Sequence, residues 1–264
     1  MKKYKSIGIW LGVFLYLVVT LGFVGRHRSR LICTTIDVVI KDTTKNKFVN
    51  KNDVILFLKK EKPQYIGEPL DSIDISHIED VLKAYPVIKQ AEIYKTLEGE
   101  LMLEVEQRTP IMRVFDKDNN SCYMDIEGEV MPLSDKYTAR VAIASGNIDA
   151  LPLIEKSKIT EIDKNDTTLA FDPIIVDIYK LGKHIYEDSF WRSQFEQIYI
   201  TPEKEFELIP KVGAHIIKLG TIKDYEWKLK KLKAVYEKGF QIKGWNTYKT
   251  INLKYGDQVV CTKR

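Results

Sequence analysis

The stretch "SHIEDVLKAYPVIKQAEIYKTLEGELMLEVEQR" (residues 76–108) carries the clearest folding signals of the chain. Its first part has apolar residues at helical spacing, and Pro86 then ends the predicted helix. These apolar residues are Ile78, Val81, Leu82 and Tyr85. Ser76 and Glu79 have the spacing of a capping box at the start of this helix. Two alternating segments follow around the turn "LEGE", so the stretch predicts a helix and then a β-hairpin.

The sequence before this stretch adds a strand and a further helix. "TTIDVVI" (residues 34–40) alternates with a period of two, which predicts a strand. In "FVNKNDVILFLKK" (residues 48–60), Asn50 is a favourable N-cap and Asp53 falls in the first helical turn. The predicted order is therefore β-α-α-β-β over residues 33–108, which is the size of a small independent domain.

Residues 109–264 have a different sequence pattern, in which many short predicted strands are separated by turn residues. The segments "IMRVFD", "CYMDIEG", "EVMPL" and "RVAIASG" are typical of an antiparallel meander. Asp172 and Pro173 together predict a helix start. Residues 222–239 form an amphipathic pattern that Gly239 ends, and the pattern does not decide whether this helix packs on the sheet or on a partner. We predict an α+β fold whose second domain, residues 109–264, is mainly antiparallel β-structure with packed helices.

The segment "TYKTINLKYG" (residues 247–256) predicts a half-buried strand near the C-terminus. Ile251 and Leu253 lie on one side of the alternating pattern, and Thr250 and Asn252 lie on the other. A last strand often lies at the edge of a sheet, where its N–H and C=O groups are unpaired. Either this edge is open to a partner, or another strand of the same sheet covers it.

The N-terminal segment predicts a membrane anchor. Residues 7–25, "IGIWLGVFLYLVVTLGFVG", contain no charged residue, and about 20 apolar residues span the hydrocarbon core of a bilayer. The alternative is a cleaved signal peptide, but its apolar region is usually shorter and ends at small residues. Residues 1–6 then form a short tail. Three cations stand on each side of the segment, so charge alone does not give the orientation.

Composition and motifs point away from catalysis. The chain has 264 residues, of which 44% are hydrophobic and 30% charged, and its net charge of +4 does not call for a nucleic-acid partner. Three cysteines make no disulfide framework, and the four histidines are scattered. No phosphate-binding loop or nucleophile motif occurs, and we interpret Asp125 and Glu127 as solvated residues. We predict no enzymatic activity, no catalytic residues, no metal, no cofactor and no small-molecule substrate.

The order of these elements resembles the bacterial cell-division family FtsQ, called DivIB in some bacteria. The segment "FVNKNDVILFL" and the stretch up to "QRTPI" resemble a POTRA domain, which ends in "Q-R-x-P". "YMDIEGEVMPL" resembles the strand–"D-x-x-G"–strand at the start of the family's β-domain, and "INLKYGDQVV" resembles its terminal strand. Asn252 stands where an acidic residue is usual in that strand. The segment "YTARVAIASG" is most similar to versions from the Bacteroidetes.

The resemblance implies a non-enzymatic scaffold in the inner membrane, with a cytoplasmic N-terminus and a periplasmic bulk, that links early and late division proteins at the septum. The POTRA domain would contact other divisome proteins, and the terminal strand would bind FtsB-like and FtsL-like coiled-coil proteins by strand addition. The matching residues in this sequence are Lys249, Thr250, Ile251, Asn252, Leu253, Lys254, Tyr255 and Gly256.

Two other classes of protein are alternatives to the scaffold. A POTRA-type periplasmic chaperone or secretion accessory protein usually has several POTRA repeats or a membrane barrel, whereas this sequence shows one β-α-α-β-β unit. A membrane-anchored cell-wall enzyme would need a nucleophile motif, which the sequence lacks. The chaperone remains the alternative function.

Overall fold

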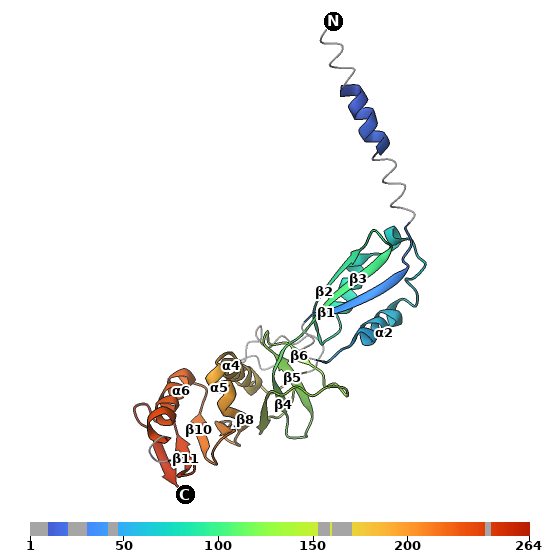
Figure 1. The fold of residues 1–264 in the computed structure, drawn as a ribbon. Helices are drawn as coiled ribbons and strands as arrows, with labels where there is room; N and C mark the ends of the chain where they lie inside the picture. The colour runs from blue at the N-terminus through green and yellow to red at the C-terminus, as the bar shows by residue number, and fades with distance from the viewer. Residues whose placement is uncertain (1–9, 21–30, 42–46, 153–158, 160–170, 241–243) are drawn as a thin grey trace. The chain divides into compact units, whose positions relative to one another are not determined.

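The computed structural model describes residues 10–20, 31–41, 47–152, 159, 171–240 and 244–264. The chain divides into two compact units, Met1–Gln107 and Arg108–Arg264. Figure 1 shows the elements of each unit.

Residues 10–20 form a helix whose apolar side chains are exposed, among them Trp10 and Phe14. The remainder of the predicted anchor, residues 7–9 and 21–25, lies outside the described residues. Among the described residues, no helix reaches the length and apolar character that a membrane crossing requires. The membrane anchor therefore stays a prediction.

The first unit has the β-α-α-β-β order that the sequence predicts (Figure 1). Its elements are β1 (Thr35–Lys41), α2 (Lys51–Glu61), the short 3-10 helix η1 (Leu70–Ser72), α3 (Ile75–Lys83), β2 (Ile88–Lys95) and β3 (Glu100–Gln107). The three strands form a sheet of order β1-β3-β2, in which β1 is parallel to β3 and β2 is antiparallel to it. Both outer strands of this sheet, β1 and β2, are therefore edge strands.

The helix starts in this unit follow from local hydrogen bonding. The Asn50 side chain accepts a hydrogen bond from the Asp53 N–H and the Asp53 side chain accepts one from the Asn50 N–H, which confirms the predicted cap of α2. The predicted capping box of α3 is wrong. Asp74 caps this helix by accepting from the His77 N–H, so Ser76 already lies inside the helix. The Glu79 carboxylate instead accepts from the backbone N–H of Ile93.

The second unit is built on one nine-stranded sheet of order β12-β11-β10-β9-β8-β7-β4-β5-β6. The strands are β4 (Pro110–Phe115), β5 (Ser121–Asp125), β6 (Val130–Met131), β7 (Ala142–Gly146), β8 (Phe195–Ile200), β9 (Phe206–Pro210), β10 (Ile216–Gly220), β11 (Tyr248–Asn252) and β12 (Val260–Lys263). Five of the neighbouring pairs are antiparallel, and the pairs β4/β7, β7/β8 and β10/β11 are parallel. The sheet is thus mixed, with mostly antiparallel pairing.

The helices of this unit supply apolar side chains to the sheet's core. They are α4 (Ile174–Glu187), α5 (Ser189–Gln194) and α6 (Tyr225–Ala234), which continues into the π-helical turn η3 (Val235–Gly239). Leu229 and Leu232 of α6 are fully buried in the same cluster as Ile198 and Leu208 of the strands. The amphipathic helix that the sequence predicts over residues 222–239 therefore packs on the sheet of its own unit.

Gly146 lets two parallel strands of this sheet meet closely at their ends. It has φ of +112°, and a Cβ atom at this position would lie 2.2 Å from the Ile200 carbonyl oxygen of β8. An L-residue with a side chain would therefore be both strained and obstructed at this point.

Candidate binding edge of the sheet

The predicted binding strand does not lie at the edge of the sheet. β11 pairs in parallel with β10 on one side and antiparallel with β12 on the other. The expectation that residues 249–256 present an open strand edge is therefore wrong. The reason is that the chain turns back after Gly256 and adds β12 to the same sheet, so β12 is the outermost strand.

The inward side of the predicted strand belongs to the core. Ile251 and Leu253 have exposed fractions of 0%, which confirms that one side of the alternating pattern is buried. The Leu253 N–H donates to the Lys218 carbonyl oxygen at the end of β10, at 2.9 Å. These two residues hold the strand in place, and their side chains are not available to a partner.

The other predicted residues of the strand lie at or near the surface. Lys249 is exposed, and Thr250 and Asn252 are half-buried. The Asn252 side-chain oxygen accepts a hydrogen bond from the Lys254 N–H at 3.0 Å, so this amide shapes the end of the strand. The Lys254 ammonium group pairs with Glu205, the residue before β9, and β10 separates β9 from β11 in the sheet.

The turn after β11 is fixed by side chains from α6. The Trp227 Nε1–H donates to the Gly256 carbonyl oxygen at 3.3 Å, and the Lys231 ammonium group donates to the same oxygen at 3.1 Å. Lys231 also donates to the Tyr255 carbonyl oxygen. The Tyr255 side chain is 49% exposed and points to no core cluster. The helix thus fixes the backbone of the turn that carries this exposed tyrosine.

β12 is the outermost strand at one end of the nine-stranded sheet, as β6 is at the other, and its outer side has no strand partner among the described residues. Its residues pair with β11 in the register Thr250–Thr262, Ile251–Cys261 and Asn252–Val260. The Arg264 N–H donates to the Thr247 carbonyl oxygen at 3.2 Å, so Arg264 faces β11. Because backbone groups alternate between the two sides of a strand, Thr262 also faces β11 and the main-chain groups of Cys261 and Lys263 face outward. The terminal edge lies beside the C-terminus (Figure 1).

Sequence reasoning missed β12, although a signal for it was present. "GDQVVCTK" has turn residues at Gly256 and Asp257, followed by β-branched residues at Val259 and Val260. This pattern is typical of the second strand of a hairpin, but four residues give little periodicity to detect.

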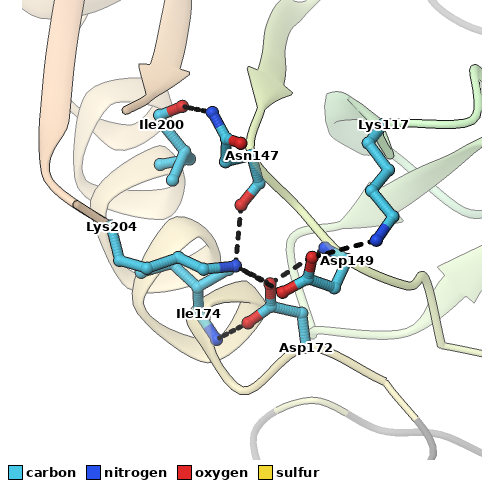
Figure 2. Close-up of polar contacts among 7 residues, drawn as sticks. All are labelled: Lys117, Asn147, Asp149, Asp172, Ile174, Ile200 and Lys204. Atoms are coloured by element: carbon cyan, nitrogen blue, oxygen red, sulfur yellow. Dashed lines mark hydrogen bonds and ion pairs between the residues drawn. The ribbon is translucent and has the colours of Figure 1, made fainter. Parts of the chain in front are cut away.

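A charged cluster around Lys204 in this unit has a structural role. Figure 2 shows the Lys204 ammonium group between Asp149, at 2.7 Å, and Asp172, at 2.6 Å, with a further bond to the Asn147 carbonyl oxygen at 2.8 Å. Asp172 also accepts from the Ile174 N–H at the start of α4. Desolvation lowers the pKa of Lys204, but its hydrogen bonds to the two carboxylates outweigh this effect and raise the pKa. A lysine held protonated in this way joins the β8–β9 turn to α4 and is unsuited to act as a base or nucleophile.

Neither the cysteines nor the acidic residues assemble a catalytic or metal centre in the described part of the chain. Cys33, Cys122 and Cys261 are all free thiols. Burial raises the pKa of Cys122 to about 12, which keeps this thiol protonated near neutral pH. No group of three His, Cys, Asp or Glu side chains is placed to hold a metal ion among the described residues.

Asp125 is buried, which corrects its interpretation as a solvated residue. Its carboxylate accepts from the N–H groups of Glu127 and Glu129, at 2.9 and 2.7 Å, and so fixes the turn around Gly128. Arg108 Nη1 lies 2.9 Å from the same carboxylate. The arginine of "Q-R-x-P" and the aspartate of "D-x-x-G" are therefore ion-pair partners.

The fold defines a two-unit α+β protein whose larger sheet ends in β12, a strand without a partner on its outer side in the described ranges. Residues 31–106 match the family model of a POTRA-like domain, and residues 109–262, more than half of the chain, match the model described as FtsQ/DivIB, C-terminal related. The chain belongs to the FtsQ/DivIB family. A relative is the cell division protein FtsQ of Rhodothermus marinus, which is 24% identical over 197 residues, covering 74% of this chain and 67% of the relative.

Proposed function

We propose that the chain is a non-enzymatic scaffold of cell division that binds partner peptides by strand addition at the β12 edge. The observation that carries this proposal is that β12 ends a nine-stranded sheet and has no strand on its outer side within the described part of the chain. The family assignment and the relative's name support the cell-division role.

The edge chemistry supports strand addition. In this mode, main-chain hydrogen bonds supply affinity and alternate side chains supply specificity. The outward N–H and C=O groups of Cys261 and Lys263 are the groups that a partner strand would meet. Lys263 and Arg264 of the C-terminal segment are exposed, as is Lys249 of the paired strand β11, so the edge is basic and favours a partner segment with acidic residues.

The residues 249–256 then divide into supporting and contacting positions. Ile251 and Leu253 anchor the hairpin in the core, and Thr250 and Asn252 lie in the strand that pairs with β12. Lys249, Lys254, Tyr255 and Gly256 are exposed at the surface. We propose that these surface residues contact a bound segment at its flanks and that β12 supplies the main-chain bonds.

Partners and location follow the family resemblance and are part of the proposal. FtsB-like and FtsL-like coiled-coil proteins bind at the β12 edge, and other divisome proteins bind the POTRA-like unit, whose outer strands β1 and β2 are both sheet edges. Residues 7–25 cross the inner membrane once, with residues 1–6 in the cytoplasm and the remainder in the periplasm, at the septum. The protein links early and late division proteins there.

A proline substitution tests strand addition directly. Cys261→Pro removes an outward N–H from β12 without removing a hydrogen bond of the β11–β12 ladder, and proline is tolerated on edge strands. Cys261→Val keeps this N–H and serves as the matched control. The full chain and both variants are titrated with the soluble portions of the host's FtsB-like and FtsL-like proteins, after thermal melts confirm that each variant is folded.

We expect Cys261→Pro to weaken binding by up to about tenfold, the effect of losing one main-chain hydrogen bond, and Cys261→Val to leave it unchanged. Equal binding by both variants would show that the partner docks elsewhere. In cells, depletion of a division scaffold gives filaments without septa. Loss of outer-membrane proteins with normal septa would instead favour the POTRA-type chaperone.

A further inference from the structure

A second surface of the larger unit has the form of a small binding site. A cavity of about 220 Å³ opens where α4 and α5 pack over strands β4, β7 and β8. Ile111, Ile185 and Phe195 form its apolar walls. An apolar cavity of roughly 150 Å³ holds a benzene molecule, so this one has room for a single large apolar side chain.

The rim of this cavity is basic. Arg140, Arg192 and Lys211 line it together with a single acidic residue, Glu196. The Lys211 ammonium group donates to the Arg192 carbonyl oxygen at 2.9 Å, and the Arg192 guanidinium lies 5.3 Å from the centre of the Tyr186 ring. These contacts hold Lys211 and Arg192 at the opening.

The two arginines lack acidic partners in the part of the chain that the structure describes. Neither Arg140 nor Arg192 has a carboxylate within ion-pair distance there, whereas Arg108 of the same unit is paired with buried Asp125. Unpaired guanidinium groups beside an apolar cavity suit a ligand that presents a carboxylate next to an apolar group, because arginine binds carboxylates with two parallel hydrogen bonds.

We propose that this cavity, here called the arginine pocket (Ile111, Arg140, Ile185, Arg192, Phe195 and Lys211), binds a peptide segment of another protein in which a large apolar residue is flanked by acidic residues. The apolar side chain enters the cavity and rests against Ile111, Ile185 and Phe195, which are nearly fully buried members of the core. The flanking carboxylates contact Arg140 and Arg192. The proposal rests on the proposed function only in that the chain binds other proteins, and it adds a docking site on α4 and α5, elements separate from β12.

Short peptides of matched design test this proposal. The probe is acetyl-Gly-Glu-Phe-Glu-Gly-amide. Two controls are acetyl-Gly-Gln-Phe-Gln-Gly-amide, which lacks the charges, and acetyl-Gly-Glu-Ala-Glu-Gly-amide, which lacks the apolar anchor. Each is titrated into the full chain labelled at the isoleucine δ1 methyl groups, and Ile111→Val and Ile185→Val assign the two signals from the pocket walls.

We expect the probe to shift the Ile111 and Ile185 methyl signals and each control peptide to bind at least about tenfold more weakly. We expect the double variant Arg140→Gln/Arg192→Gln to bind the probe at least about tenfold more weakly than the parent chain does. Lys230→Gln/Lys238→Gln, with two cations removed from the α6 region, keeps the response. Added salt weakens binding of the probe because the arginines are partly exposed to solvent.

Three results would overturn the proposal. They are the absence of methyl shifts with the probe at millimolar concentration, equal binding of all three peptides, and unchanged binding by the double arginine variant. Cys261→Pro separates this site from the β12 edge. If Cys261→Pro no longer binds the coiled-coil partners but still binds the probe, both sites stand. If instead the probe gives no arginine-dependent methyl shift while Cys261→Pro still loses the coiled-coil partners, only the arginine-pocket proposal fails and the edge proposal stands.

Discussion

Arg108 and Asp125 form an ion pair that joins the first residue of the larger unit to the turn after β5. Arg108 Nη1 lies 2.9 Å from Asp125 Oδ2, and the Asp125 side chain is 1% exposed. The same carboxylate accepts two backbone hydrogen bonds of the turn. One buried aspartate thus organises both the entry of the chain into this unit and its first tight turn.

Removing either charge of this pair is expected to destabilise the larger unit strongly. Arg108→Met leaves the Asp125 carboxylate buried without its ion-pair partner, and loss of one member of a buried pair costs about 3–5 kcal/mol. Chemical denaturation with urea measures this as a lower free energy of unfolding.

The exposed pair Lys117–Asp149 gives the matched control. Its side chains are 56% and 60% exposed, and surface pairs contribute about 0–1 kcal/mol. Because Asp149 also contacts Lys204, Lys117→Met is the appropriate variant. A loss for Arg108→Met no larger than for Lys117→Met would show that the buried pair has no special role.

His215 makes the packing under β11 sensitive to pH. Its side chain is 1% exposed, and its Nε2 atom lies 3.0 Å from the Tyr236 hydroxyl oxygen. Phe240 and Trp245 surround the ring, at centroid distances of 5.1 and 6.4 Å. Burial lowers the pKa of His215 from its usual 6.5, and the positive charge of Arg264 adds to this effect.

The sign of the pH effect follows from this shift. In the unfolded chain His215 takes up a proton at a higher pH than in the folded chain, so the free energy of unfolding rises with pH. The stabilisation is complete above about pH 6.5 and is lost as the pH falls below it, toward the lower folded pKa. We expect the urea concentration at the unfolding midpoint to decrease as the pH is lowered from about 7.5 to about 5.

His215→Gln isolates this contribution because glutamine does not titrate. We expect the parent chain to lose more stability than this variant over the same pH range. Identical pH profiles for the two proteins would show that another group is responsible.

Gly146→Ala is expected to disrupt the β7–β8 contact. The new Cβ would meet the Ile200 carbonyl oxygen at 2.2 Å, in addition to the strain at φ of +112°. The combined cost is about 3 kcal/mol or more. Gly244→Ala is the control, because Gly244 has φ of +80° and no atom within 4 Å of the added Cβ. Similar melting temperatures for the two variants would contradict the close approach.

The sequence predicted the elements whose signals are local. The Asn50 cap and the hairpin around Gly99 each depend on a few neighbouring residues, and both are present in the structure. The helix predicted to start at Asp172 and Pro173 is also present, but it begins at Ile174 with Pro173 as its N-cap. The buried role of Asp125 was not predictable in this way, because it depends on Arg108, which is 17 residues earlier in the chain.

The sheet edge was predicted at the wrong strand for a similar reason. Residues 248–252 have the alternating pattern of an edge strand, but the order of strands depends on contacts far apart in sequence. β12 has four residues and little periodicity, so its pairing with β11 was not visible. The arginine pocket likewise combines side chains from strands and helices that are up to about a hundred residues apart.

Amide hydrogen exchange of β12 tests most directly whether this edge binds a partner strand. In the free chain, the outward N–H groups of Cys261 and Lys263 have no strand partner among the described residues and should exchange fast. We expect both amides to become protected when the soluble portions of the FtsB-like and FtsL-like proteins are added at saturating concentration. If these two amides stay unprotected while another surface of the chain becomes protected, β12 is not the docking edge.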